Sequence, residues 1–516
     1  MTKSGTTNVR RLVVVLGDQL DYQRYCPNDF NPHQDMFWMA EATEESTHVL
    51  SNKHRIVFFL SSMRHFRDYL GVQNLPLIYH ELASDGTDSS LSSILEADIN
   101  HLNPQEIYLK QPGDYRVRTS LIKVIEKLGV PLTIAEDESF LCSQEQFSDH
   151  ASNRKVLRLE FFYREIRRRH NILMDNDKPV GGEWNFDKNN RESFGKKGPP
   201  SIPENQGTKP DKITQEVIQF VNARFPSHPG NLDNFNWPVT PNDAEAQLDH
   251  FIDQCLPLYG RFQDAMWTGQ NTLFHSLVAA PLNLRLLDPL KVVRKVETAY
   301  YEERAPIAAV EGFIRQVVGW REYVRGIYNL HMPNYRTHNH LKADIPLPSF
   351  FWSGKTDMAC MSSCLTQVLE TGYGHHIQRL MVIGLYSLLI GVRPEEINDW
   401  FLASYVDAVD WVTTPNVIGM SQFADGGLMA SKPYSATGAY INRMSNYCAS
   451  CRYNPKESTG PNACPFTSSY WAFLDRHRET LSSNQRMSMQ LRNLSRMDDQ
   501  RLKDIRKAAD SHLHQL

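Results

Sequence analysis

The sequence has no long apolar run, no excess of charge of one sign and few cysteines. No stretch reaches the roughly 18 uncharged apolar residues of a membrane span, and no signal-peptide apolar region follows the opening "MTKSGTTNVRR". We therefore expect no membrane partner and a cytoplasmic location. The 55 basic and 59 acidic side chains give a formal charge of −4, so net charge does not indicate nucleic-acid binding, although basic residues gather locally in "YREIRRRH" (163–170).

Three of the eight cysteines nevertheless form a pattern. Cys448, Cys451 and Cys464 have the spacing C-x2-C-x12-C, in which a short loop lets two thiolates turn toward one centre. Tetrahedral zinc and a [4Fe–4S] cluster both accept such ligands, and the spacing alone favours zinc. Cys360 or Cys364 would be the fourth ligand, and unligated core cysteines are the remaining alternative.

Short apolar runs alternate with helix-length segments in the first 145 residues. Five runs rich in Val, Ile and Leu lie at 11–17, 55–60, 75–81, 106–110 and 130–136. Such runs predict buried parallel strands, so residues 1–145 are expected to form a doubly wound parallel-sheet α/β domain. Its ligand would bind beyond the carboxyl ends of the strands, where Asp18 follows the first run.

The rest of the chain divides into an irregular part and a helical part. Gly, Pro, Asn and Asp are frequent in much of 146–240, which predicts an interdomain linker with a functional loop. From 241 to 516 the pattern is helical. In "HHIQRLMVIGLYSLLIG" (375–391) apolar residues recur at helical spacing, which predicts a core helix of a large all-α domain.

Long motifs of this sequence resemble one family. The stretch 356–474, which begins "TDMACMSSCLTQVLETGYGHHIQRL", is similar to the bacterial iron–sulfur photolyases and cryptochromes, the prokaryotic (6-4) photolyase group. Further motifs that resemble this family are "VLGDQL" (15–20), "SSMRHF" (61–66), "LNLRLLDP" (282–289) and "VVGWREYVRGIY" (317–328). The resemblance covers essentially the whole chain, and it implies an α/β antenna domain followed by an all-helical FAD-binding domain.

The resemblance also implies which residues hold the cofactors. A [4Fe–4S] cluster would be bound by Cys360, Cys448, Cys451 and Cys464. FAD would be held by Tyr259, His275, Ser276, Leu277, Gln316, Arg321, Arg379, Asp407 and Thr413. Many relatives carry Asn or an acid in place of Thr413, which faces the flavin N5 position. The antenna 6,7-dimethyl-8-ribityllumazine would contact Asp18, Glu45 and His48, the last standing where relatives have Tyr.

By the same resemblance, two adjacent histidines belong to the lesion site. His376 takes the position of the residue thought to protonate the lesion in eukaryotic (6-4) enzymes, and His375 precedes it. The third His of their H-H-x-x-x-H pattern is Leu380 here. Tyr434 and Tyr440 match positions that line the lesion pocket. A single imidazole must therefore do the work of two, or a tyrosine assists it.

Electrons for flavin photoreduction would travel along aromatic side chains. Trp400, with Trp352 as the outer step, matches the carriers of the family. Relatives often have Tyr where this chain has Phe401, and phenylalanine is too hard to oxidise to take part.

Together these residues predict light-driven repair of (6-4) pyrimidine–pyrimidone photoproducts. The partner would be UV-damaged DNA, single- or double-stranded, from which the lesion is extruded, and the protein would act as a monomer. In the loop 179–195, Trp184, Lys188 and Arg191 are expected to contact the DNA. One alternative is a cryptochrome-like blue-light photoreceptor on the same fold, and another is a zinc-stabilised DNA-binding protein without redox chemistry.

Overall fold

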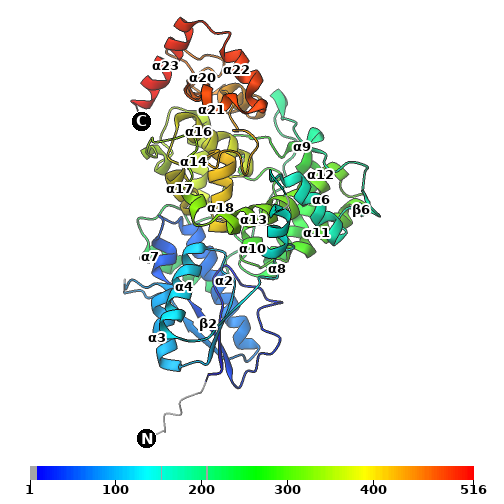
Figure 1. The fold of residues 1–516 in the computed structure, drawn as a ribbon, viewed down its shortest axis with the longest axis vertical. Coiled ribbons are helices and arrows are strands. Elements are labelled where there is room, and N and C mark those ends of the chain that lie inside the picture. The colour runs from blue at the N-terminus through cyan, green and yellow to red at the C-terminus, as the bar shows by residue number, and fades with distance from the viewer. Residues whose placement is uncertain (1–8, 86, 153, 205–206, 516) are drawn as a thin grey trace.

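The computed structural model describes residues 9–85, 87–152, 154–204 and 207–515. The α/β part lies at one end of an elongated molecule, and the last helices of the chain lie at the opposite end (Figure 1). Helices from the middle of the sequence fill the space between them. The predicted order, a parallel-sheet α/β part followed by a helical part, is confirmed.

Five parallel strands form the sheet, in the order β3-β2-β1-β4-β5. Their bounds are β1 (Arg11–Val14), β2 (Asp35–Ala40), β3 (Leu77–His80), β4 (Glu106–Lys110) and β5 (Leu132–Ala135). Because the chain winds outward in both directions from β1, the crevice for a ligand lies beyond the carboxyl end of this strand.

One of the five strand predictions is wrong. Residues 55–60 belong to helix α2 (Lys53–Val72), and the strand that completes the sheet is β2, at 35–40. A short buried apolar run occurs both in strands and in helix segments, and the N-terminal cap of the helix distinguishes the two here. The Asn52 side chain accepts a hydrogen bond from the His54 backbone N–H and starts the helix.

Helices cover both faces of the sheet. The α/β part also contains α1 (Thr43–Thr47), α3 (Leu91–Leu102) and α4 (Tyr115–Leu128). Successive strand residues point to opposite faces, so Val13 packs in the large core that includes α2, whereas Leu12 and Val14 pack in a smaller core with α3 and α4. Asp114 caps α4, and this places its carboxylate at the carboxyl end of the sheet.

The stretch 146–240 is more regular than expected. It contains most of α5 (Gln144–Ser152), then α6 (Leu159–His170), β6 (Met174–Asp175), β7 (Lys178–Pro179) and α7 (Lys212–Arg224), with 3-10 turns η1 (Asp187–Asn189) and η2 (Gly195–Lys197). Helix α7 packs against α2 through the fully buried Val217 and Val221, which are four residues apart on one helix face. Only the segments between these elements are irregular.

Short helices and π-helical turns build the remainder. The helices are α8 (Pro241–His250), α9 (Leu256–Phe262), α10 (Ala279–Asn283), α11 (Pro289–Tyr301), α12 (Ile307–Ile314), α13 (Glu322–His331), α14 (Ala359–Thr371), α15 (His376–Gln378), α16 (Leu385–Ile390), α17 (Pro394–Ser404), α18 (Asp410–Thr414), α19 (Gly438–Met444), α20 (Pro465–Arg476), α21 (Arg478–Ser482), α22 (Ser488–Leu494) and α23 (Asp499–Leu513). The π-helical turns are η3 (Phe251–Cys255), η4 (Arg315–Arg321), η7 (Arg379–Gly384) and η8 (Pro415–Ser421). The 3-10 turns are η5 (Asn334–Thr337), η6 (Ser349–Trp352), η9 (Tyr447–Ala449) and η10 (Gln485–Met487).

The core helix predicted at 375–391 is present as α15, η7 and α16 in succession, ended by Gly391 in the left-handed conformation. Interruptions of this π-helical kind are frequent at functional sites. Within the described ranges, we find no helix with the length and apolar character that a bilayer crossing requires.

Candidate functional site

An ion pair lies at the start of η7. Arg379 donates two hydrogen bonds to the Asp407 carboxylate, at 3.0 Å from Nη1 and 3.1 Å from Nη2. Its Nε donates to the Gly374 carbonyl at 2.6 Å, and its guanidinium carbon lies 4.0 Å from the centre of the Tyr405 ring. The pair is stable in these surroundings because each charge is matched by the other. The structure thus brings together the two residues expected beneath a flavin.

Two stacked imidazoles lie near this pair. The ring centroids of His275 and His375 are 4.5 Å apart with an interplanar angle of 13°, and Tyr259 meets His275 edge-on. In the described part of the chain, Nε2 of His275 and Nε2 of His375 have no hydrogen-bond partner. Burial lowers the pKa of His375 and, with the charges of His376 and Arg379, lowers that of His275 to about 3. Unpartnered buried nitrogens are costly, so a polar group of a bound molecule is expected here.

His376 lies at the edge of this cluster, close enough for its charge to lower the pKa of His275. Its side chain is accessible to solvent. The surrounding protein nevertheless removes enough hydration, with a further effect of the Arg379 charge, to lower its pKa to about 4. Because the side chain is accessible and yet surrounded closely enough by protein to lose hydration, we interpret its surroundings as a recess. His376 is therefore neutral at pH 7 until a negative charge approaches it.

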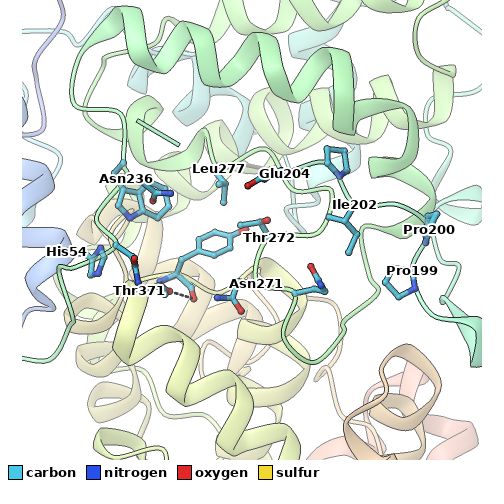
Figure 2. A pocket seen from close by; sticks show the side chains of 15 residues that line it. His54, Pro199, Pro200, Ile202, Glu204, Asn236, Asn271, Thr272, Leu277 and Thr371 are labelled. Carbon is cyan, nitrogen blue, oxygen red and sulfur yellow. Dashed lines mark hydrogen bonds between the residues drawn. The ribbon is translucent and has the colours of Figure 1, made fainter. Parts of the chain in front are cut away.

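A cavity of about 710 Å³ adjoins the cluster. Figure 2 shows its wall, with Thr272 and Leu277 from the segment before α10, Thr371 at the end of α14, and Asn236 from the segment between α7 and α8. Tyr373 joins the cavity to the cluster, because it lines the cavity and lies close enough to the ion pair for both charges to shift its pKa. The volume falls within the roughly 300 to 1,000 Å³ of small-molecule and cofactor sites.

Charged side chains surround the two tyrosines of the predicted lesion pocket. Burial raises the pKa values of Tyr434 and Tyr440, and Arg191 and Asp264 are among the charged residues near enough to shift both. Arg191 is thus brought from the loop 179–195 to the tyrosines. Asp264 was not predicted, since nothing in the irregular stretch after α9 marks it. Burial raises its pKa to about 6 against the opposing charge of Arg191.

Trp184 is held more firmly than expected for a residue that inserts into DNA. Three guanidinium carbons lie 4.7 to 5.2 Å from its ring centre, those of Arg164, Arg167 and Arg168. Its carbonyl accepts a hydrogen bond from Arg167 Nη1 at 3.2 Å. The structure therefore places Trp184 as the anchor of its loop on α6, whereas Lys188 and Arg191 are exposed.

Four residues expected at FAD make other contacts. The Gln316 amide donates to the Gly312 carbonyl of its own helix at 3.0 Å, and the Ser276 hydroxyl accepts from the Val278 N–H at 3.5 Å. Thr413 is buried on α18. The structure brings Arg321 to the junction with the α/β part, where its guanidinium carbon lies 4.2 Å from the centre of the Phe140 ring and 5.3 Å from that of Trp411.

Four cysteines surround a small cavity at the opposite end of α14. Its lining includes Cys360, Cys448, Cys451 and Cys464. Cys364 is not part of this lining. It is completely buried, and its Sγ lies 3.9 Å from the Tyr447 hydroxyl. The cysteines form no disulfides. Over the described ranges, no three His, Cys, Asp or Glu side chains are placed to hold one metal ion, so the thiols surround a space rather than a point.

Two tryptophans connect the surface with the ion pair. Trp352 is 37% exposed and Trp400 is completely buried, with ring centroids 6.4 Å apart. Trp400 in turn lies 5.4 Å from Phe401 and 5.9 Å from Tyr405, the ring that contacts Arg379.

A second cavity lies beyond the carboxyl end of β1. Asp18 and Glu45 line it, whereas His48 does not and instead contacts the Glu44 carbonyl, 3.1 Å from its Nδ1. Burial raises the pKa of Asp18, and it raises that of Glu45 to about 7. The Glu45 shift persists although Nη2 of Arg116 lies 2.9 Å from both of its carboxylate oxygens.

A short segment lies between the cavity beside the sheet and the Arg379–Asp407 pair. Val409 and Asp410 line the cavity beside the sheet, and Asp407 holds Arg379 on the other side. Two residues of extended chain span about 7 Å, so the wall between the sites is thin at this point.

Comparisons with known proteins agree with this architecture. A family model described as deoxyribodipyrimidine photo-lyase-related protein matches residues 13–237. The chain is 43% identical over 508 residues to a (6-4) photolyase of Agrobacterium fabrum, covering 98% of this chain and 99% of the relative. Its fold is similar to that of a bacterial class III photolyase from Agrobacterium tumefaciens (TM-score 0.59, 13% identity, 92% of this chain and 98% of that chain). It is also similar to the fold of a Synechocystis sp. PCC6803 cryptochrome (TM-score 0.55, 12% identity, 86% and 89%). Since 43% identity extends over nearly the full length of both sequences, the chain belongs to the photolyase family.

Proposed function

We propose that the protein is a (6-4) photolyase, an enzyme that uses light to repair (6-4) pyrimidine–pyrimidone photoproducts in DNA. The observation that carries the proposal is the position of His376, which is accessible to solvent beside the stacked imidazoles and the Arg379–Asp407 pair. A nucleotide extruded from DNA can reach an imidazole placed in this way. The Agrobacterium fabrum relative, a (6-4) photolyase, supports the same activity for this chain.

The cluster is suited to FAD. The unpartnered nitrogens of His275 and His375 can hydrogen-bond to a polar edge of the cofactor, and Arg379 places a positive charge beside it. The adjoining cavity, with Thr272 and Leu277 in its wall, offers space for the rest of the molecule. When bound and reduced, FAD supplies the electron that light drives into the lesion.

In this proposal His376 supplies a proton to the lesion. At a pKa of about 4 the imidazole is neutral at pH 7 and can only accept a hydrogen bond or donate a weak one. An anionic partner in the recess favours the charged form and raises the pKa, so His376 becomes an acid when a phosphate or an electron-rich lesion arrives. Tyr434 and Tyr440 stay protonated, since burial raises their pKa values, and can orient the lesion through their hydroxyls.

Exposed cations can hold the DNA around the recess. Arg191 lies near both tyrosines, and Lys188 is exposed on the same loop. Such side chains bind phosphates without regard to sequence and lose affinity as salt rises. This arrangement supports recognition of the lesion in the recess and binding of the DNA backbone at its rim.

The four-cysteine cavity supports a [4Fe–4S] cluster rather than zinc. Thiolates that converge on one ion suit zinc, whereas thiols around a space suit a cluster several ångströms across. We expect Cys448→Ser to lose the broad visible absorption of an iron–sulfur protein, with a lower free energy of unfolding. Cys364→Ser, which changes a buried cysteine outside the cavity, is the matched control and should keep both. A colourless protein that contains zinc would contradict the assignment.

The cavity beside β1 is the proposed site of the lumazine antenna. Asp18 and Glu45 can accept hydrogen bonds from the hydroxyls of a ribityl chain. The free volume is about 90 Å³, below the usual cofactor range, so admission of the ring requires side chains such as the flexible Met63 to move.

Repair of an oligonucleotide with one defined (6-4) photoproduct tests the function. Reduced, FAD-loaded protein should restore the two pyrimidines under blue light and leave them unchanged in the dark. If illuminated protein leaves the lesion intact while its flavin is reduced by light, the cryptochrome-like photoreceptor becomes the better explanation.

A further inference from the structure

A buried tyrosine outside the repair site pairs with a histidine of the last helix. Tyr386 lies on α16 and is completely buried. Its hydroxyl oxygen is 2.8 Å from Nε2 of His512, on α23. Both helices lie in the part of the molecule farthest from the sheet (Figure 1). A phenol hydrogen-bonded to a neutral imidazole can lose an electron and a proton together, because the imidazole takes the proton.

We propose that Tyr386 is a redox-active residue, which gives an electron to oxidised Trp400 while its hydroxyl proton passes to Nε2 of His512. The inference rests on the proposed function, since photoexcited oxidised flavin is the oxidant that first takes an electron from Trp400. The Trp400 radical cation gains one electron and becomes neutral. Tyr386 loses one electron as its O–H bond breaks, and an N–H bond forms on His512. The products are a neutral tyrosyl radical and an imidazolium.

Phe351 fills the space between electron donor and acceptor. Its ring meets Trp400 edge-on with centroids 5.5 Å apart, and its centroid lies 6.5 Å from that of Tyr386. The centroids of Trp400 and Tyr386 are therefore at most about 12 Å apart. Phenylalanine is too hard to oxidise to carry the charge itself, so the electron tunnels through this packed ring in one step.

His512 is suited to accept the proton. Burial lowers its pKa to about 4, so its imidazole is neutral at pH 7. With the ring hydrogen on Nδ1, the lone pair of Nε2 accepts the hydrogen bond from Tyr386. The proton therefore moves along a hydrogen bond that already exists, and no side chain has to rotate.

Another tyrosine, Tyr405, lies nearer to Trp400 but is a poorer electron donor. Its centroid is 5.9 Å from that of Trp400. Its hydroxyl is buried and has no hydrogen-bond partner among the residues described, so its proton has no destination. The Arg379 guanidinium lies 4.0 Å from the centre of its ring, and a nearby positive charge disfavours oxidation. The hydrogen bond to a base thus selects the more distant Tyr386.

The proposed radical forms close to the four-cysteine cavity. The ring of Tyr386 lies 5.5 Å from that of Phe466, which lines this cavity.

The test measures radicals after a flash of blue light on FAD-loaded, oxidised protein. Transient absorption follows the tryptophan radical, and electron paramagnetic resonance of freeze-trapped samples detects the tyrosyl radical. Tyr386→Phe removes the hydroxyl and keeps the ring, and His512→Gln keeps a hydrogen-bonding group that cannot take a proton. Tyr470→Phe, another buried tyrosine of the same region, is the control. Flavin absorbance shows that each variant is folded.

We expect a tyrosyl signal in the unsubstituted protein and in Tyr470→Phe, its loss in Tyr386→Phe and His512→Gln, and a longer-lived tryptophan radical in these two. Deuterated water should slow formation of the tyrosyl radical but not of the tryptophan radical. A tyrosyl signal unchanged in Tyr386→Phe, or absent in unsubstituted protein that does form the tryptophan radical, would overturn the inference. Absence of any tryptophan radical would overturn it together with the electron path.

Repair by protein reduced with dithionite separates the two proposals, because it bypasses photoreduction. Tyr386→Phe should then repair (6-4) DNA as fast as the unsubstituted protein. If neither repairs while the radical results are as expected, the repair function fails and the role of Tyr386 stands.

Discussion

The two larger sites of this protein are lined by side chains of opposite character. The cluster in the helical part presents His275, His375 and Arg379, whereas the cavity beside β1 presents Asp18 and Glu45. Burial disfavours charge in both, so it lowers the pKa of His275 to about 3 and raises that of Glu45 to about 7. Desolvation favours the uncharged forms of His275 and Glu45, and the molecule that enters decides whether these groups become charged. A site rich in imidazole and guanidinium then favours an anionic partner, and one rich in carboxyl groups favours a neutral molecule with hydroxyl donors.

The largest effect should come from removing the imidazole of the helical site. His376→Ala should lower light-driven repair of (6-4) DNA by on the order of 10² to 10⁴-fold, the usual contribution of a positioned acid. Flavin binding and flavin photoreduction should persist, and absorption spectra during illumination check both. Lys188→Ala, a change at the exposed rim, is the control and should weaken DNA binding without changing the rate at saturating DNA. Equal losses of repair and photoreduction in His376→Ala would show that this histidine serves the cofactor rather than the lesion.

A smaller effect is expected when the ion pair loses its acid. Asp407→Asn leaves the Arg379 charge without its partner, and breaking a largely buried pair typically costs about 3 to 5 kcal/mol. The Arg379 side chain is 23% exposed, so we expect about 3 kcal/mol in the free energy of unfolding, measured with urea, and poor retention of FAD.

The matched control for Asp407 is an exposed acid in a similar pair. Asp357 pairs with Arg452, and both side chains are more than 60% exposed. Asp357→Asn should therefore change the free energy of unfolding by less than about 1 kcal/mol. Similar losses of the free energy of unfolding in both variants would mean that burial does not increase the contribution of the Arg379–Asp407 pair to stability.

The smallest effect should appear in the acidic cavity, as a dependence on pH. The folded protein holds the Glu45 pKa at about 7, above its ordinary value of 4.5, so folding favours the protonated form. This contribution to stability is complete below pH 4.5 and is lost as pH rises through 7. Between pH 5 and pH 8 the free energy of unfolding should fall more in the unsubstituted protein than in Glu45→Gln, which cannot ionise.

Variants at Glu45 also test the proposed lumazine site. Loss of one hydrogen bond of about 1 kcal/mol corresponds to roughly a fivefold weaker lumazine affinity, and we expect this in Glu45→Ala at pH 6. Glu45→Gln should bind equally at pH 6 and pH 8, and fluorescence titration measures both. A pH dependence that survives in Glu45→Gln would assign the titration to another group, such as Asp18.

Much of the fold was predictable where a pattern extends over many residues. The core helix at 375–391 follows from its apolar spacing, and four strands follow from their flanking signals. The error at 55–60 arises because a run of only five apolar residues fits either state, and the Asn52 cap that decides between them is a single hydrogen bond. Helix α7 was missed because its short apolar pattern stands between two segments rich in Gly, Pro and Asn.

The site was harder to predict than the fold, because charges that act together come from distant segments. Asp264 and Arg191 are 73 positions apart, and nothing in the sequence around either residue indicates that both lie near Tyr440. Trp184 lies in a segment with the composition of an exposed loop, yet three arginines of the preceding helix cover its ring. The partnership of Tyr386 with His512 had no sequence signal, since it depends on how α23 packs at the end of the molecule.

The thin partition at residues 407–410 also limits how such a protein can change. Asp407 and Asp410 serve opposite compartments although only two positions lie between them. An insertion or deletion there would shift the Arg379–Asp407 pair and the wall of the cavity beside β1 at once, so the two sites cannot be changed independently by altering this stretch. The cavity beside β1 is therefore more readily changed from the sheet side, through residues that do not contact the ion pair.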